Sequence, residues 1–412
     1  MIKVCMIDYR RYQHDAYLRR YLEALLQAGA QVDVLCLRHP DYPTPAQRPN
    51  LRIFTIPATR SHGSFLSYLF GYSTAFLLFT AWLLVLYIRN PYHVIHIHNM
   101  PDFLIFTALI PRMLGAKLIL DIRDPMPEFY RSKFKLRARS LTMHCLQMQE
   151  RLSAAAAHAV VTPNANFKHN LISRHIPEDK ITLLPYRPDP HLFNRRNVKK
   201  DKTNHPGSFT LIYPGTIAPR YGLDVAIRAL PLLKASIPQI RLVIIGPQTT
   251  YSAQLADLAE ELGVSAQVDL QPAIALNKIP QQIAQANVGI YPAYPDAHMS
   301  IATPMKVLEY ITMGIPVIAA RLKGLEERLD NRAVMFFEPG DVEQFSDCVT
   351  ELANSPARRA QLVQNADELL LQHDQKDNSH QSYLALLNHL LGPEVGESLG
   401  KIEQENRVGR VP

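Results

Sequence analysis

The 412-residue sequence contains few of the residues that mark secreted, fibrous or disordered proteins. Its four cysteines lie far apart and form no Cys-x-x-Cys pair, which disfavours a disulfide scaffold and a zinc ribbon and favours a reducing compartment. With only 17 glycines the chain is not collagen-like, and a hydrophobic content of 47% excludes disorder of the whole chain. The opening residues lack the basic n-region and cleavage site of a signal peptide and read as a strand.

Acidic residues are scarce in the first half of the chain, although the net charge of the whole is only +7. Residues 1–200 contain 27 Lys and Arg against 13 Asp and Glu, a net charge of +14, whereas residues 201–412 carry −7. A basic half predicts an anionic partner such as nucleic acid, an anionic membrane face or a lipid phosphate, although a solvated surface would give the same count. The cations have little aromatic interleaving and match no recognition motif, which disfavours nucleic acid.

Apolar runs and helical periodicities alternate along almost the whole chain. The expected strands cover 2–7, 31–37, 51–57, 94–98, 117–122 and 158–162 in the first half, and 209–213, 241–246, 267–270, 288–291, 315–319 and 334–337 in the second. This βαβ series predicts an α/β protein with parallel, doubly wound sheets. We expect two Rossmann-like domains facing a cleft, with ligands outside the carboxyl ends of the strands.

A polar stretch rich in Pro, Lys and Arg separates the two series. We therefore predict an N-terminal domain over 1–187, a linker over 188–206 and a C-terminal domain over 207–377. A last helix over about 378–391 is assigned to the N-terminal domain, and 393–412 is expected to form a mobile polar tail.

No charged residue occurs in the segment 61–88, and Thr74–Ile88 is apolar at 13 of 15 positions. A helix of ~20 apolar residues can span a bilayer, but this segment lies between two strands of one predicted sheet, which disfavours a span. A buried crossover helix and a helix docked in the membrane interface both remain open. Five cations follow within nine residues, at Arg131, Lys133, Lys135, Arg137 and Arg139. They either add electrostatic attraction to a membrane or form a solvated helix face.

The strongest local signal is the stretch Thr303–Tyr310. Thr303 is expected to cap a helix that has Pro304 in its first turn. Free N–H groups at a helix N-terminus favour phosphate, and Lys306 adds a cation there. Glu309 is flanked by apolar residues, so its carboxylate should need polar partners such as sugar or ribose hydroxyls. The alternative is a surface helix with one ordinary glutamate.

A second signal is the glycine turn Pro214–Thr216, at the carboxyl end of an expected strand. It leads through Arg220 into a helix, so backbone groups and a guanidinium could approach a diphosphate. A plain strand-to-helix turn would look the same. Two phosphate-type loops from different strands of one domain are nevertheless more indicative of a ligand than either alone.

In the first domain, polar residues gather after two expected strands, where they should face the cleft. They are His96, His98, Asn99 and Asp102 after one strand and Asp121, Arg123, Asp124 and Glu128 after the other. A metal site is disfavoured, because we expect His96 and His98, which alternate along a strand, to point to opposite faces. The sequence also lacks the GxSxG, HExxH, P-loop lysine and long GxGxxG motifs.

Together these stretches resemble family 4 glycosyltransferases, the retaining nucleotide-sugar enzymes of the GT-B fold, and in particular one bacterial branch of that family. The resemblance covers roughly residues 1–390 and is carried by His98–Phe103, Asp121–Glu128, Arg220–Asp224 and Pro304–Tyr310. It implies that the second domain binds a nucleotide sugar and the first an acceptor.

The resemblance also implies roles for single residues. Glu309 matches the last carboxylate of an E-x7-E motif and would hold the ribose, while Arg220 and Lys306 would neutralise the departing diphosphate. Preorganised cations of this kind can replace a metal ion, so no cofactor is implied beyond the nucleotide-sugar co-substrate. The other donor-binding residues would be Gly215, Thr216, Gly246, Thr303 and Pro304. The acceptor-side residues would be His98, Asn99, Asp102, Asp121, Asp124 and Glu128.

Three positions depart from the family pattern. Ile301 stands where E-x7-E has its first glutamate, so a donor-sugar contact is missing or supplied elsewhere. Arg123 stands where the family usually has a histidine near the transferred sugar, and we expect a catalytic role for it. Tyr9–Tyr12 takes the place of the usual glycine-rich loop after the first strand.

The resemblance therefore implies a hexosyltransferase that moves a sugar, with retention, from a nucleotide-diphosphate donor to a lipid-linked or glycan acceptor in envelope or exopolysaccharide assembly. With the basic half and the uncharged segment, it predicts a cytoplasmic protein, peripheral on the inner face of the plasma membrane. Retention without an obvious nucleophile would mean front-face attack through an oxocarbenium-like state. Two alternatives stay open: a degenerate subunit that only binds a nucleotide sugar, favoured by Ile301 and Arg123, and a nucleotide-sugar epimerase of the same fold.

Overall fold

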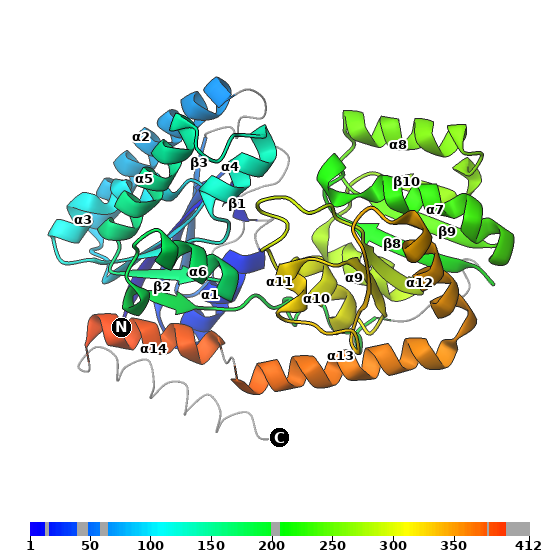
Figure 1. Cartoon of the computed structure of the whole chain (residues 1–412). Helices are drawn as coiled ribbons and strands as arrows, with labels where there is room; N and C mark the ends of the chain where they lie inside the picture. Colours follow the sequence, from blue (N-terminus) through cyan, green and yellow to red (C-terminus); the bar gives the residue numbers. More distant parts are fainter. Residues whose placement is uncertain (13–15, 39–47, 58–64, 199–206, 377–378, 393–412) are drawn as a thin grey trace, which may run out of the picture. The chain divides into compact units, whose positions relative to one another are not determined.

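A computed structural model describes residues 1–12, 16–38, 48–57, 65–198, 207–376 and 379–392. The chain divides into two compact units. Unit 1 comprises Met1–Tyr186 with Asp377–Pro412, and unit 2 comprises Arg187–Lys376. Each is an α/β unit built on a parallel sheet, as the alternating sequence predicts (Figure 1).

Unit 1 contains a seven-stranded sheet in the order β3-β2-β1-β4-β5-β6-β7, and its paired strands all run parallel. Most of these strands are short apolar runs that are almost completely buried, as in a parallel sheet covered by helices on both faces. They are β1 (Lys3–Arg11), β2 (Gln31–Leu37), β3 (Leu51–Ile56), β4 (Val94–His98), β5 (Lys117–Asp121), β6 (Ala159–Thr162) and β7 (Ile181–Leu183).

Helices cover both faces of this sheet, and alternate residues of β1 show which helices lie on which face. Ile7 and Tyr9 pack into a core with α2 (Phe65–Arg89), the 3₁₀ helix η2 (Asp102–Ala108), α4 (Met126–Phe134), α5 (Leu141–Ala156) and α6 (Ala165–Ser173); the short α3 (Leu109–Met113) follows η2 directly. Val4 and Met6 pack against α1 (Ala16–Gln27) and α14 (Ser379–Leu391) on the other face. The last described helix of the chain therefore completes the core of the unit that begins the chain.

Unit 2 contains a six-stranded parallel sheet in the order β10-β9-β8-β11-β12-β13. Its strands are β8 (Phe209–Pro214), β9 (Ile240–Ile245), β10 (Val268–Gln271), β11 (Val288–Tyr291), β12 (Val317–Ala320) and β13 (Met335–Phe337). Its helices are α7 (Leu223–Ser236), α8 (Thr250–Glu261), α9 (Ile279–Gln285), α10 (Met305–Thr312), α11 (Lys323–Glu326), α12 (Val342–Asn354) and α13 (Pro356–Lys376).

The structure differs from the sequence-based expectation in several places. β1 continues through Arg11, so most of Tyr9–Tyr12 is strand rather than loop. The sequence did not predict the strand β7 or the helices α3, α5, α6, α11, α12 and α13. In the predicted linker 188–206, Phe193 is buried in the core of unit 2, while 199–206 lie outside the described residues. The predicted tail 393–412 also lies outside them.

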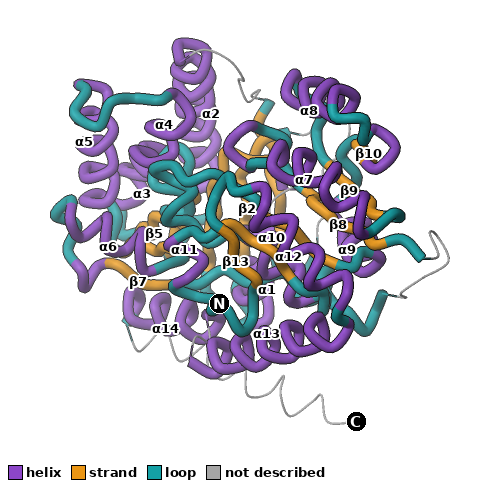
Figure 2. The backbone as a smooth tube through the Cα atoms, turned by 45° about the vertical axis from the view of Figure 1, so that its right-hand side comes forward, coloured by secondary structure: helices purple, strands orange, loops and turns teal. Residues whose placement is uncertain are grey.

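Both sheets have a topological switch point, where the order of strands reverses beside the first strand of the unit. This point lies between β1 and β4 in unit 1 and between β8 and β11 in unit 2. Figure 2 shows the strands of each unit among surrounding helices, joined to them by loops. Because ligands of open α/β sheets bind outside the carboxyl ends of the strands at such points, each unit has one place where a site should be sought.

Candidate functional site

Two glycines let three segments of unit 2 approach each other closely beside its switch point. Gly215 follows β8 directly, and a Cβ atom placed on it would lie 2.5 Å from Lys306 Nζ. Gly246 follows β9, and a Cβ atom there would overlap the carbonyl oxygen of Gly215. The structure thus brings together Gly215, Gly246 and Lys306, which were predicted from separate motifs, and a side chain at Gly246 would collide with the backbone of Gly215.

Helix α10 begins next to this turn with an open N-terminus. Pro304 occupies its N-cap position, and the helix starts at Met305. The prediction that Thr303 caps it was wrong, because the Thr303 hydroxyl instead donates to the carbonyl oxygen of Gly324, 3.2 Å away. No side chain among the described residues caps α10. Since the first amides of a helix have no partner within it, they are available to an anion.

Lys306 lies in the first turn of α10 among three tyrosine rings. Its Nζ atom is 4.0 Å from the ring centre of Tyr213, 5.0 Å from that of Tyr221 and 5.7 Å from that of Tyr291. Burial lowers the pKa of Lys306 to about 7, and the nearby Glu309 carboxylate opposes that shift. The aromatic faces attract the ammonium form. A phosphate bound beside it would favour that form further and raise the pKa again.

Glu309 follows one turn later on α10 and is partly buried. Burial raises the pKa of its carboxyl group to about 7, while Lys306 opposes this effect. Among the described residues, no hydrogen bond reaches the Glu309 carboxylate. A carboxylate removed from water without donors is costly, and hydroxyl groups of a ligand would supply those donors.

Arg220 is a second cation beside the ring of Tyr221, which Lys306 also faces. It lies on the 3₁₀ helix η5 (Pro219–Tyr221), with its guanidinium 5.4 Å from the ring centre of Tyr221. The backbone N–H of Tyr294 donates to the carbonyl oxygen of Arg220 over 3.0 Å, which ties this loop to the segment after β11. Thr216 is exposed in the turn before it, and its carbonyl oxygen accepts from the Tyr213 hydroxyl over 3.0 Å.

The tyrosine cage around Lys306 was missed by sequence reasoning. Tyr213 and Tyr291 come from β8 and β11, the two strands that flank the switch point. A local signal exists, because each stands immediately before a proline at the end of a strand. Asp224 was quoted only as part of a motif, yet it accepts hydrogen bonds from the hydroxyls of Tyr251 and Tyr294, at 3.1 and 2.8 Å.

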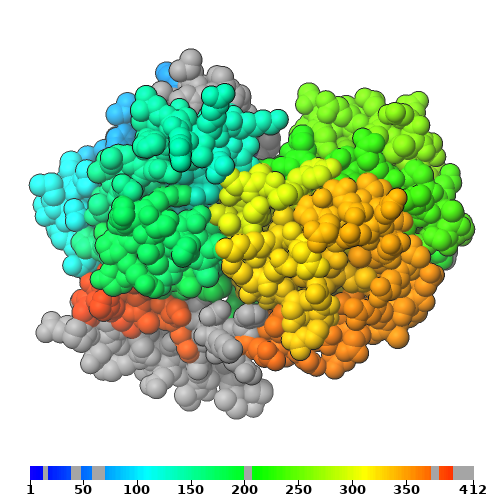
Figure 3. Space-filling view, viewed as in Figure 1, coloured from blue at the N-terminus to red at the C-terminus, as the bar shows by residue number. Residues whose placement is uncertain are grey.

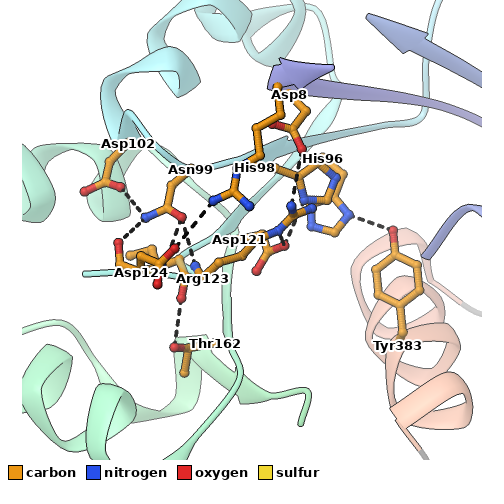
Figure 4. A network of polar contacts seen from close by, with 12 residues as sticks. Asp8, His96, His98, Asn99, Asp102, Asp121, Arg123, Asp124, Thr162 and Tyr383 are labelled. Atoms are coloured by element: carbon orange, nitrogen blue, oxygen red, sulfur yellow. Dashed lines mark hydrogen bonds and ion pairs between the residues drawn. The ribbon is translucent and has the colours of Figure 1, made fainter. Parts of the chain in front are cut away.

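In unit 1, the polar residues predicted on the acceptor side, except Glu128, form a largely buried network (Figure 4). Asp8, His98 and Asp121 lie in register on the neighbouring strands β1, β4 and β5. Arg123 Nε donates to Asp121 over 2.8 Å, Arg123 Nη1 reaches Asp8 at 3.3 Å, and His98 Nδ1 lies 2.8 Å from Asp121. The Arg123 side chain is only 1% exposed. Arg123 therefore holds these strands together, and its catalytic role stays a prediction.

Asn99 holds the loops after β4 and β5 together. Its side-chain oxygen accepts from the backbone N–H of Arg123 over 2.9 Å, and its amide donates to Asp102 and to the carbonyl oxygen of Asp124, at 2.9 and 2.7 Å. Asp102 is buried, which raises the pKa of its carboxyl group to about 7, although the Asn99 hydrogen bond opposes the shift. Asp124 is less buried and faces Arg10 at 3.4 Å.

The predicted orientation of His96 and His98 was wrong. Their ring centres lie 4.2 Å apart, because residues two apart in a strand share a face. With Asp121 they form a group whose possible metal-ligating atoms lie within 4.8 Å of one another. His96 Nδ1 is 2.9 Å from the Tyr383 hydroxyl of α14, and Arg123 already neutralises Asp121. A metal ion would have to bind beside this buried guanidinium, which is unfavourable. That the site holds no metal stays a prediction.

Glu128 belongs to a different cluster from the network around Asp121. Its carboxylate pairs with Arg174 and accepts from Asn170 over 3.1 Å. Arg174 also donates to Glu150 over 2.7 Å. Glu150 is completely buried, which raises the pKa of its carboxyl group to about 8. Glu128 of α4 is thus held by Asn170 of α6 and by Arg174 directly after that helix. Through Glu150, Arg174 also connects α5 to the same cluster.

Two family models match the chain, one in each unit. "Glycosyl transferase 4-like domain" matches residues 14–187, and "Glycosyl transferases group 1" matches residues 194–369. The chain belongs to the glycosyltransferases of this family. The resemblance to family 4 glycosyltransferases is thereby confirmed, and the loops predicted to bind the donor fall within the residues that the group 1 model matches.

Named relatives agree with this family and differ in how much of the chain they cover. A GDP-mannose-dependent alpha-(1-6)-phosphatidylinositol monomannoside mannosyltransferase of Mycolicibacterium smegmatis is 29% identical over 178 residues, 42% of this chain and 46% of that one. The matched stretch thus spans about half the length of that curated relative, and the same holds for a D-inositol 3-phosphate glycosyltransferase of Thermobispora bispora.

Solved structures confirm the fold over almost the whole chain. Sucrose-phosphate synthase of Thermosynechococcus elongatus superposes with a TM-score of 0.70 at 16% identity, covering 99% of this chain and all of that one. WaaG, a glycosyltransferase involved in lipopolysaccharide biosynthesis, gives 0.67 at 16% identity, covering 94% and 100%. The glycosyltransferase therefore has two parallel-sheet α/β domains of the GT-B type, as predicted.

Proposed function

We propose that this glycosyltransferase binds a nucleotide-diphosphate sugar in unit 2 and transfers the sugar to an acceptor bound by unit 1. The observation that carries the proposal is that Lys306 and Arg220 both lie over the Tyr221 ring, with Lys306 against the Gly215 turn and in the first turn of the uncapped helix α10. Two cations and free amides, placed where the backbone leaves room, match the charge and size of a diphosphate. The name of the mannosyltransferase relative, which includes a dependence on GDP-mannose, is consistent with such a donor.

The ribose is assigned to Glu309. Its carboxylate has no hydrogen bond from the described residues and lies one helical turn from Lys306, so it would accept ribose hydroxyls while the diphosphate occupies the start of α10. The ionised carboxylate is favoured by those new hydrogen bonds, as the ammonium of Lys306 is by the phosphates. Donor binding would therefore satisfy two groups whose charged forms burial disfavours in the free protein.

Transfer is proposed to proceed with retention, by front-face attack through an oxocarbenium-like state. As the bond between sugar and diphosphate breaks, negative charge grows on the leaving phosphate, and Lys306 and Arg220 would stabilise it more than they stabilise the bound substrate. The chain's own cations would then do the work of a divalent metal, so transfer should persist in the presence of EDTA.

A lipid-linked acceptor in envelope or exopolysaccharide assembly fits the charge of the chain better than a free sugar. Residues 1–200 carry a net charge of +14, which favours an acceptor held at an anionic surface on the inner face of the plasma membrane. The mannosyltransferase relative is named for a phosphatidylinositol-based acceptor, and WaaG is described by its role in lipopolysaccharide biosynthesis.

The first test is a thermal-shift panel of nucleotide diphosphates and their sugars, with EDTA and with magnesium. A selective rise in Tm with one nucleotide supports the donor site, and no rise with any of them overturns it. The stabilising nucleotide sugar is then incubated with lipid-linked acceptors, and the anomeric configuration of the product is read by NMR. Donor binding without nucleotide release would identify a binding-only subunit, and an altered free donor would identify an epimerase.

A further inference from the structure

Helix α2 of unit 1 is apolar on the face that it turns away from the core. Its inner face packs into the sheet core through Tyr72, Phe79 and Leu83. Its outer face carries Phe70, Leu77 and Ile88, which are 77%, 68% and 80% exposed. A helix on the surface of a soluble domain normally has charged or polar residues on that face. Between Phe65 and Ile88, α2 has no charged residue at all.

The neighbouring helices extend this apolar surface. Ile110, Met113 and Leu114 are exposed on and just after α3, which the hydroxyl of Tyr87 joins to α2 through the carbonyl oxygen of Leu114, 3.4 Å away. Leu141, Met148 and Leu152 are exposed along α5. Figure 3 shows the segment from α3 to α5 as one continuous part of the surface of unit 1. The exposed apolar residues thus belong to adjoining elements rather than to scattered positions.

The charged groups beside this surface are cations. Arg131, Lys133, Lys135, Arg137 and Arg139 are all exposed on α4 and the segment after it. Helix α4 is joined to α2 by a hydrogen bond of 2.8 Å between the hydroxyls of Tyr130 and Tyr72. The five predicted cations therefore lie on an element that contacts the apolar helix.

The acidic groups of the same region are all engaged elsewhere. Residues 65–156 contain five carboxylates, of which Asp102, Asp121 and Glu150 are at most 1% exposed. Asp124 faces Arg10, and Glu128 pairs with Arg174. The outer face of these helices therefore carries positive charge without acidic groups to balance it.

We infer that the exposed faces of α2, α3 and α5, with the cations of residues 131–139, dock on an anionic lipid bilayer. The inference deepens the proposed function and rests on its lipid-linked acceptor. Apolar side chains would enter the boundary between headgroups and acyl chains, and the cations would pair with lipid phosphates. By length and composition Phe70–Arg89 could also cross a membrane. Crossing would withdraw Phe79 and Leu83 from the sheet core, so α2 lies on the bilayer instead.

Flotation of the full-length protein with vesicles tests the inference. Phosphatidylcholine vesicles are compared with vesicles that also contain phosphatidylglycerol, at low and high salt. Wild type should float with the anionic vesicles, and less at high salt because salt screens the cations. Val85 is 44% exposed on the same helix as Leu77, and the double variant Leu77→Glu with Val85→Glu should reduce binding at least about tenfold. Lys133→Ser with Lys135→Ser should weaken binding to the anionic vesicles and reduce its salt dependence.

The matched control introduces two glutamates at exposed leucines of unit 2. Leu232→Glu with Leu371→Glu changes side chains that are 51% and 60% exposed on α7 and α13, and it should leave flotation unchanged. Equal loss in both double variants, or no flotation of wild type, would overturn the inference. The inference would also be overturned if light scattering showed a dimer of wild type that the Leu77→Glu with Val85→Glu variant, but not the control, converts to a monomer. A second copy of the chain would then cover this face.

The donor assay separates this inference from the proposed function. The Leu77→Glu with Val85→Glu variant should keep its melting profile and its thermal shift with the nucleotide sugar, because that site lies in unit 2. If nucleotides stabilise wild type while vesicles do not bind it, the docking surface is wrong and the donor site stands. If wild type binds the vesicles while no nucleotide shifts its melting temperature, the docking surface stands and the donor site is wrong.

Discussion

Donor affinity should follow a bell-shaped dependence on pH, with one limb belonging to each charged residue of α10. A nucleotide diphosphate needs the ammonium form of Lys306, and ribose hydroxyls need the carboxylate form of Glu309. Both groups have a pKa of about 7 in the free protein. Affinity should therefore be greatest near pH 7, fall at lower pH as Glu309 takes up a proton and fall at higher pH as Lys306 loses one.

The size of the alkaline limb follows from linkage. With a pKa of about 7, roughly half of Lys306 is protonated at pH 7 and about 3% at pH 8.5. If bound phosphates restore its ordinary pKa of 10.5, affinity should fall about fifteenfold between these two pH values, and binding should take up nearly one proton at pH 8.5. Each limb should also depend on the other residue, because each charge stabilises its partner.

Isothermal titration from pH 5.5 to 8.5 measures both limbs. The titrant is a nucleotide sugar, because it has no monoester phosphate that titrates near pH 6. Repeating the titration in buffers of different ionisation enthalpy gives the protons taken up. Lys306→Met should abolish the alkaline limb and move the remaining acid limb to higher pH. Glu309→Gln should abolish the acid limb and move the alkaline limb to lower pH. A flat wild-type profile, or an alkaline limb that survives in Lys306→Met, would refute this assignment.

Three further substitutions test separate parts of the chain. Arg220→Ala should lower kcat roughly a hundredfold with a smaller change in KM, because the guanidinium stabilises the leaving phosphate, and an unchanged kcat would move Arg220 outside the reaction. Gly222→Ala should cost at least about 1 kcal/mol in urea unfolding, since Gly222 has a φ of +62° and an added Cβ would overlap the Pro292 carbonyl oxygen; full stability would contradict this packing. Tyr383→Phe should destabilise the protein by about 1–3 kcal/mol in the same assay, because buried His96 loses its partner, and no loss would show that another group replaces it.

Local spacing was enough to predict the elements of the fold and part of the site. Strands such as Val317–Ala320 are unbroken apolar runs, and Lys306 and Glu309 are three residues apart on one helix and so had to be neighbours. The glycine turn at Gly215 was visible because it ends a strand. These features depend on residues close together in the chain, which is where periodicity and capping rules apply.

The features that were missed depend on contacts between distant segments. Thr303 fits a helix cap by composition, but its hydroxyl bonds to a carbonyl oxygen 21 residues away. The cage around Lys306 needs Tyr213 and Tyr291 from strands that are neighbours only after the sheet order is known. The contacts of Arg123 with two buried carboxylates were not predicted either, because Asp8 and Asp121 belong to strands that are far apart in the sequence. The error over His96 and His98 has another cause, because residues two apart in a strand share one face and the sequence alone already places them together.

The return of α14 to unit 1 bears on the order in which the protein folds during synthesis. Tyr383 packs against Tyr21 of α1, with ring centres 4.8 Å apart, and closes the face of the sheet formed by the first residues of the chain. Unit 2 is continuous in sequence, so it can complete its core while the ribosome still holds the last helix. The N-terminal unit is made first but finished last, and until then an apolar strip lined by Val4, Met6 and Leu22 stays open to chaperones.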